Sequence, residues 1–300
     1  MELDLNSFNS ADDSTVVYRG SYEDTPENKS ILIASGIAEI AENAFRDFEN
    51  LEEVTIPPSV RKIGACAFSG CQRLKRVRLS FGLIEIADEA FSSCPSLNEI
   101  IIPDSCESIG EGAFEACASL TNVKLSERLK VIGSCAFAFC FNLTGITIPD
   151  SCILVEFNAF ASCFSLESVK LSDNMGLIDE STFEGCRSLK YVDLPTKLVK
   201  TSRRAFKGCS SLANIILPSN TKIIGFDAFY GCRALGRIAI PKDLMEIEDN
   251  DAFGGCNALM EISFGGNREM WESLCRGGTL TVTKSDGSLF TPKIFFLDLK

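Results

Sequence analysis

A dipeptide that recurs along the chain at an almost constant interval constrains the fold most strongly. Phenylalanine returns every 23 residues, with one interval of 24 at the last step, and alanine precedes it in nine of ten copies. The ten copies are Phe45, Phe68, Phe91, Phe114, Phe137, Phe160, Phe183, Phe206, Phe229 and Phe253. A unit this short cannot bury its own apolar side and must share a core with its neighbours. The sequence therefore predicts stacked coils rather than a compact globule.

The residue types follow a fixed order within each unit. Three residues after the phenylalanine comes cysteine in nine copies, and six residues after it comes leucine in all ten. A short alternation follows, as in Val54-Thr55-Ile56, and indicates a β-strand with two apolar side chains inward and one outward. Proline or serine usually comes next, and proline ends a strand because it has no amide proton. We read each unit as a strand, a corner, a short extended piece, another corner and a helical turn.

The unit pattern LxxVxIPxxVxxIGxxAFxxC resembles the BspA-like class of leucine-rich repeats. Leu51 to Cys71 and Leu97 to Cys117 are close matches, and the likeness covers about residues 31–264. Pattern and resemblance together predict an α/β repeat solenoid. We expect a right-handed leucine-rich-repeat superhelix with a parallel β-sheet on one face and short helical turns or extended segments on the others. Members of this class are associated with surface attachment, so the resemblance implies adhesion or binding of a host protein.

The solenoid is expected to lie between two segments of different character. Residues 1–30 are acidic and irregular, which predicts an N-terminal cap or a partly disordered segment; residues 31–264 hold about ten 23-residue repeats. Ile31 fits a strand position one period before Val54, so we expect eleven parallel strands. The extra residue near 249–251 should form a local bulge.

Residues 265–300 are predicted to be a C-terminal capping segment. The run from Gly265 to Trp271, with Ser285 to Ser288, resembles the closing segment found after such repeats. Trp271 can cover the last core layer. Residues 279–283 alternate like a strand, and Ser285 to Ser288 suits a hairpin turn.

The absence of histidine excludes more chemistry than any other count. Serine-type and papain-type hydrolases, the common zinc enzymes and histidine acid–base pairs all use an imidazole. Carboxylate pairs occur only as neighbours expected to be exposed, Glu52 with Glu53 and Asp249 with Asp251. The glycines show no phosphate-loop spacing. We expect no enzymatic activity, no cofactor and no metal site.

Charge and hydropathy limit the kinds of partner that the chain can have. The net charge of −12 opposes non-specific binding to nucleic acid or anionic lipid. No stretch reaches the roughly 20 apolar residues of a membrane-spanning helix, and the first residues lack the features of a secretory signal. We expect a protein or glycan partner, no nucleic acid, no membrane insertion and a monomer. Localisation stays open: cytoplasmic as read, or cell surface or secreted if an upstream leader was removed.

Nine of the fourteen cysteines occupy one position of the repeat. Zinc sites need thiolates that converge on one point, whereas residues one coil apart form a line. We therefore expect reduced cysteines that pack as small buried hydrophobes, with Cys106 and Cys152 also in the core. Cys66, Cys135 and Cys275 are the candidate exposed thiols.

The outward strand positions form the candidate binding surface, because the core does not dictate them. One interpretation is a solvated face of mixed charge. The other is a docking surface for a protein or a glycan that includes Arg76, Arg78, Ile101, Lys170, Tyr191 and Arg237. We hypothesise a non-catalytic binding module for protein–protein recognition or cell-surface adhesion. The alternatives are an intracellular scaffold or adaptor, and one recognition portion of a longer polypeptide.

Overall fold

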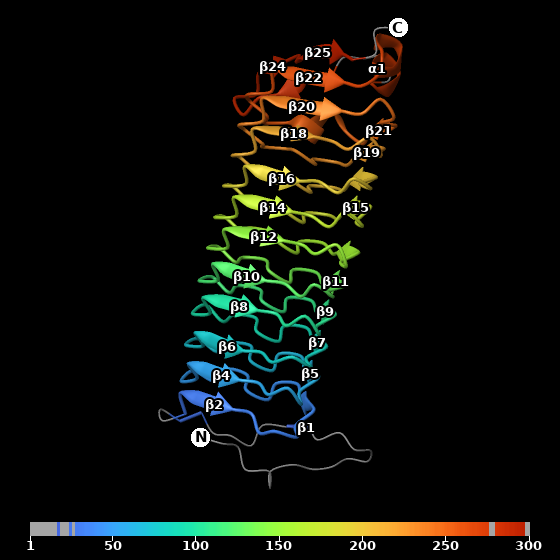
Figure 1. Cartoon of the computed structure of the whole chain (residues 1–300). Coiled ribbons are helices and arrows are strands. Elements are labelled where there is room, and N and C mark those ends of the chain that lie inside the picture. Colours follow the sequence, from blue (N-terminus) through green and yellow to red (C-terminus); the bar gives the residue numbers. More distant parts are fainter. Residues whose placement is uncertain (1–16, 19–23, 26–27, 276–279, 298–300) are drawn as a thin grey trace.

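The chain folds into a stack of coils that rise along one axis (Figure 1). The computed structural model describes residues 17–18, 24–25, 28–275 and 280–297. Each repeat contributes one strand to each of two faces, and the strands of neighbouring repeats run parallel. The predicted right-handed leucine-rich-repeat solenoid is confirmed.

The longer strands lie on one side of every coil, and we call the outward side of these strands the sheet face. Eleven of the described strands follow the repeat, as predicted: β2 (Ser30–Leu32), β4 (Glu53–Thr55), β6 (Arg76–Arg78), β8 (Glu99–Ile101), β10 (Asn122–Lys124), β12 (Gly145–Thr147), β14 (Ser168–Lys170), β16 (Tyr191–Asp193), β18 (Asn214–Ile216), β20 (Arg237–Ile240) and β22 (Glu261–Phe264). The sequence did not predict β25 (Lys293–Phe296), which pairs with β22 in parallel as a further strand. Where these strands pair, each residue lies opposite the residue one repeat later, as Val54 does with Val77. The pairing is interrupted between β6 and β8, between β10 and β12, and between β16 and β18.

The extended piece expected between the two corners is itself a short strand. These strands form a second parallel sheet: β1 (Val17–Tyr18), β3 (Glu39–Ile40), β5 (Lys62–Ile63), β7 (Glu85–Ile86), β9 (Ser108–Ile109), β11 (Val131–Ile132), β13 (Leu154–Val155), β15 (Leu177–Ile178), β17 (Lys200–Thr201), β19 (Ile223–Ile224) and β21 (Glu246–Ile247). Pairing is continuous from β1 to β13 and again from β15 to β21. The second residue of most of these strands points into the core.

The Ala-Phe segment is a succession of turns rather than the predicted helical turn. Its backbone amides alternate in direction: Ala67 donates within its own coil, whereas Phe68 donates to the carbonyl of Ala90 in the next coil at 2.8 Å. Cys66 at φ 52° and Gly70 at φ 77° lie in the left-handed region of backbone conformation. This conformation turns successive backbone amides in opposite directions, one toward its own coil and the next toward the neighbouring coil. Because every second amide bonds to the neighbouring coil, a continuous helix does not form in these turns; the last copy differs, since Ala252 and Phe253 lie in the short 3₁₀ helix Asn250–Phe253. Helix content in the described residues is correspondingly low.

The interior consists of rows of like residues. The ten repeat phenylalanines are fully buried. Adjacent rings stack with centroids 4.9 to 5.7 Å apart and planes within 11° of parallel. A short 3₁₀ helix, Asn250–Phe253, accommodates the extra residue, so Phe253 still stacks on Phe229. The predicted bulge therefore stays local.

Beyond the last repeat the chain forms its longest helix, α1 (Arg268–Leu274). The side chain of Asn267 caps it by accepting a hydrogen bond from the backbone N–H of Met270. Trp271 is only 5% exposed, and its ring lies 5.2 Å from that of Phe264 in β22. The core at the last repeat is thus covered by the aromatic side chain of Trp271.

An antiparallel hairpin follows, formed by β23 (Val282–Thr283) and β24 (Leu289–Phe290). Ser285 to Ser288 lie in its turn, as the sequence predicts, while Thr279 lies outside the described residues. Most of residues 1–30 also lie outside the described residues. The division of the chain at residues 31 and 264 stays a prediction.

The phenylalanine row sets a stability test. Phe137 stacks between Phe114 and Phe160, so Phe137→Ala leaves a cavity in the middle of the row. We expect the free energy of unfolding to fall by about 3–5 kcal/mol, measured by urea denaturation. Phe139→Ala is the matched control, because Phe139 is 41% exposed, and it should cost under about 1 kcal/mol. If both variants lose the same free energy of unfolding, the buried row does not stabilise the fold as we expect.

Candidate binding surface

The outward side chains of the sheet face form two columns along the solenoid. In nearly every three-residue strand the middle residue is buried, and the residues on either side of it point to solvent. Where neighbouring strands pair, the parallel register sets equivalent residues about 4.8 Å apart. Pairing is interrupted between β6 and β8, between β10 and β12, and between β16 and β18. One column is Glu53, Arg76, Glu99, Asn122, Gly145, Ser168, Tyr191, Asn214, Arg237 and Glu261; the other is Thr55, Arg78, Ile101, Lys124, Thr147, Lys170, Asp193, Ile216, Ala239 and Ser263.

Two of the six residues predicted for the binding surface are paired with neighbours in the same column. Arg76 bonds to Glu53 on β4, and Arg237 bonds to Glu261 on β22 at 2.9 Å. Both pairs are exposed to solvent, so each contributes little to stability. Arg78 makes no ion pair within the described part of the chain.

A shallow groove of about 870 Å³ lies in the middle of the sheet face, across β10, β12, β14 and β16. Gly145 on β12 has no side chain, so the first column of outward side chains is interrupted between Asn122 and Ser168. Lys124, Thr147 and the strand ends line its other side. The missing side chain at Gly145 and the interrupted pairing between β10 and β12 coincide at this recess.

The groove brings together only two of the predicted residues, Lys170 and Tyr191. The others lie nearer the two ends of the stack (Figure 1): Arg76 and Arg78 on β6, Ile101 on β8 and Arg237 on β20. Sequence reasoning did not select Asn122, Lys124, Gly145 or Thr147. The available signal was a glycine at an outward strand position where the other copies carry a side chain.

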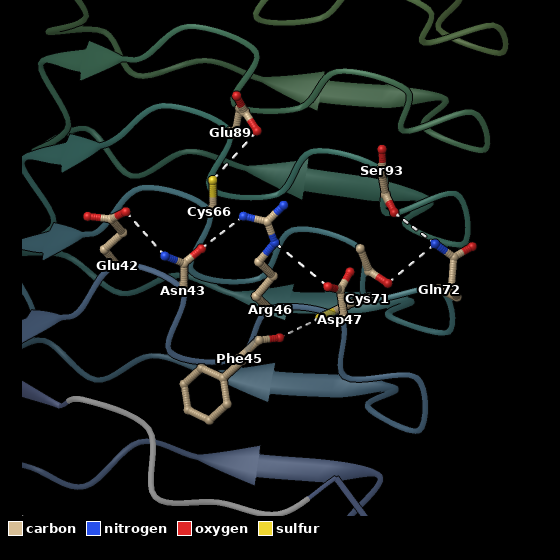
Figure 2. Close-up of polar contacts among 11 residues, drawn as sticks. Glu42, Asn43, Phe45, Arg46, Asp47, Cys66, Cys71, Gln72, Glu89 and Ser93 are labelled. Carbon is tan, nitrogen blue, oxygen red and sulfur yellow. Dashed lines mark hydrogen bonds and ion pairs between the residues drawn. The ribbon is translucent and has the colours of Figure 1, made fainter.

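The repeat cysteines form hydrogen bonds in addition to packing in the core. Each donates its thiol proton to the carbonyl of the phenylalanine in the preceding coil, with Sγ–O distances of 3.1 to 3.3 Å. Figure 2 shows the first of these bonds, from Cys71 to Phe45. All nine are buried, as are Cys106 and Cys152, which confirms the expectation of a buried thiol row. In the first copy this position holds Phe48, whose ring packs edge-on against that of Phe45.

Burial also keeps these thiols protonated. Desolvation raises the pKa of Cys117, Cys186 and Cys256 to about 12, against an ordinary value of 9.0. It raises the pKa of Cys106 to about 12 and that of Cys152 to about 11. A thiol that remains protonated is a poor nucleophile and a poor metal ligand.

The three thiols predicted to be exposed are in fact half-buried. Burial raises the pKa of Cys66, Cys135 and Cys275 as well, and at Cys66 the neighbouring carboxylate of Glu89 adds to this effect. Figure 2 shows the Cys66 thiol donating to Glu89 at 3.5 Å. None of the three therefore has the low pKa of a reactive cysteine.

Within residues 17–18, 24–25, 28–275 and 280–297, no cluster of cysteine, aspartate and glutamate side chains is arranged to hold a metal ion. In the same part of the chain, no helix has the length and apolar character required to cross a membrane.

Thiol labelling tests the burial pattern. A bulky maleimide added to the native protein should react with at most Cys66, Cys135 and Cys275, and slowly, because the other cysteines are buried. Unfolding in urea should release all fourteen for reaction. Mass spectrometry of the labelled protein counts the modified residues. Rapid native labelling of repeat cysteines would contradict the buried row.

The raised thiol pKa values also predict alkaline sensitivity. Above pH 9 the unfolded chain releases thiol protons that the native protein retains, so stability is full below pH 9 and falls as the pH rises toward 12. Each such thiol contributes up to about 1.4 kcal/mol per pH unit. Urea midpoints at pH 8, 9.5 and 10.5 measure the slope. Cys186→Ala should show a shallower slope than the parent, and an unchanged slope would refute this origin.

Comparisons with known proteins find a family model and solved structures that resemble this chain. The model of the BspA type leucine rich repeat region matches residues 38–166 and 154–275. A solved leucine-rich repeat protein of T. pallidum is 28% identical, with a TM-score of 0.53 over 71% of this chain and 91% of that chain. A leucine rich cell surface protein from Faecalibacterium prausnitzii is 26% identical, with a TM-score of 0.44 over 91% of this chain and 89% of that chain. A search of curated proteins finds no match.

The two matched segments overlap and together cover most of the chain. The aligned phenylalanine and cysteine rows and the parallel register run through both segments. The chain belongs to the family of BspA type leucine-rich repeat proteins.

Proposed function

We propose that the protein is a non-catalytic recognition module that binds another macromolecule through its sheet face. One observation carries the proposal: large side chains point outward from strands whose inward residues already complete the core. Ile101, Tyr191 and Ile216 are 60%, 71% and 74% exposed. Large apolar and aromatic side chains in solvent are the usual anchors of interfaces. The proposed surface comprises Arg76, Arg78, Ile101, Lys170, Tyr191 and Arg237, on a protein that acts as a monomer.

Cell-surface adhesion is the setting we propose first, because the family resemblance implies surface attachment. A second candidate, an intracellular scaffold or adaptor, is favoured by a separate observation. All fourteen cysteines are free thiols, and free thiols in this number suit a reducing compartment. The two candidates share the binding surface and differ in the source of the partner.

Charge reversal on the sheet face tests the proposal. The double variant Arg76→Glu, Arg78→Glu should lose capture of a partner that the parent protein retains from host extract or from the lysate of the producing cell. Capture from host extract supports adhesion, and capture from the producing cell supports the adaptor. Quantitative mass spectrometry of the bound fraction measures both, and we expect a loss of about tenfold or more, or about 1.4 kcal/mol.

The matched control reverses two basic residues away from the sheet face, Lys130→Glu and Arg233→Glu, which are exposed and make no ion pair in the described part of the chain. It carries the same change in charge and should capture the partner as the parent does. If the sheet-face variant binds normally while the control does not, recognition lies on another face.

A further inference from the structure

We propose that the groove at the centre of the sheet face binds a neutral oligosaccharide, whose sugar units run along the solenoid axis across β10, β12, β14 and β16. The inference rests on the proposed function, because it assigns a ligand class to part of the same face. Three features of the groove carry it: the polarity of its lining, the balance of its charges and the aromatic ring at one end.

Polar groups form the accessible lining of the groove. Asn122, Thr147 and Ser168 offer amide and hydroxyl groups to solvent. The aliphatic residues along it are all buried: Val123, Leu125, Ile146, Ile148 and Val169. A protein partner is held mainly by apolar and aromatic anchors in desolvated pockets, which the groove floor lacks. Sugar hydroxyls need closely spaced donors and acceptors, and the floor supplies both.

The charges in the groove have opposite signs. Lys124 and Lys170 face a lining that also includes Glu127, Asp150 and Asp193. Lys170 lies opposite Asp193 in register, and neither lysine makes an ion pair within the described residues. An anionic sugar chain would meet three carboxylates in a protein whose net charge is already −12. The lysines and carboxylates are instead placed to donate to and accept from uncharged hydroxyls.

Tyr191 supplies a ring at the end of the groove. It is highly exposed on β16, its register partner Ser168 is small, and no ring or cation stacks on it in the part of the chain that the structure describes. An uncovered aromatic face is suited to stack on the apolar face of a sugar. Paired strands repeat about every 4.8 Å, and β10 and β12 are neighbours that do not pair, so the three spacings give a groove at least about 14 Å long, room for about three sugar units.

The test uses the full chain and an array of immobilised neutral oligosaccharides, with sialylated and uronate-containing glycans on the same array. We expect binding to neutral members, followed by Kd measurement on the strongest of them. Tyr191→Ala, which removes the ring, and Gly145→Gln, which fills the floor, should each weaken binding about tenfold or more. A Cβ at residue 145 lies 3.3 Å from Ser168 Oγ, and the backbone there is not left-handed, so the added side chain requires only a small local shift.

Ala239→Gln is the matched control, because it adds the same side chain at an outward position of β20 outside the groove. Its affinity should stay within about twofold of the parent. Thermal unfolding shows whether each variant keeps the parent fold. If Gly145→Gln unfolds early, the conservative pair Tyr191→Ala and Tyr191→Phe decides, because phenylalanine keeps the ring and should retain most of the affinity.

Each other outcome overturns the inference in a distinguishable way. Binding to acidic glycans alone rejects the neutral class. Equal binding by the parent and by both groove variants places the glycan elsewhere. If no glycan binds while Arg76→Glu, Arg78→Glu still abolishes capture of a protein partner, the groove proposal fails and sheet-face recognition stands. If no glycan binds and that variant captures normally, both proposals fail.

Discussion

The vertical alignment of one aromatic ring over the next is the interaction on which the rest of the structure depends. The ring centroids are 4.9 to 5.7 Å apart, close to the spacing of about 4.8 Å between parallel strands. Core and sheets therefore repeat at similar distances, and the ring row continues from coil to coil where the pairing of the strands is interrupted. Because every coil repeats the same contacts, stability is added coil by coil rather than from one central core.

The cysteine row follows from the same geometry. The turn that carries each phenylalanine alternates its amides between its own coil and the next, and the thiol of the next coil adds a hydrogen bond to the phenylalanine carbonyl. A buried carbonyl is better satisfied with a donor than without one, and cysteine supplies that donor from a side chain small enough to be buried beside the ring. The repeat thiols thus serve packing and hydrogen bonding, and their raised pKa values keep them protonated and unreactive.

Function is separated from stability in this arrangement. The inward residues of each strand complete the core, so the outward residues are free to differ from coil to coil, and the core rows beneath Gly145 stay buried. Neighbouring outward residues are held in register by the backbone, which places Ser168 beside Tyr191 without a dedicated loop. In the function that we propose, ligand selection would depend on the identities of these outward side chains, because the backbone already fixes their positions.

The sequence by itself determined the parallel solenoid, the eleven strands of the sheet face that follow the repeat, and the buried rows, because a strict period forces like residues into line. Phe137 and Cys163 were assigned to the core on that ground, and both are fully buried. Only the tertiary structure decided that the extended piece forms a second sheet, that the Ala-Phe segment is not helical and that β25 joins β22. These features depend on hydrogen bonds between coils, which leave no periodic mark of their own. The groove likewise required the structure, because Arg76 and Tyr191 look equivalent in the repeat, and only the depth set by Gly145 and its neighbours distinguishes their surroundings.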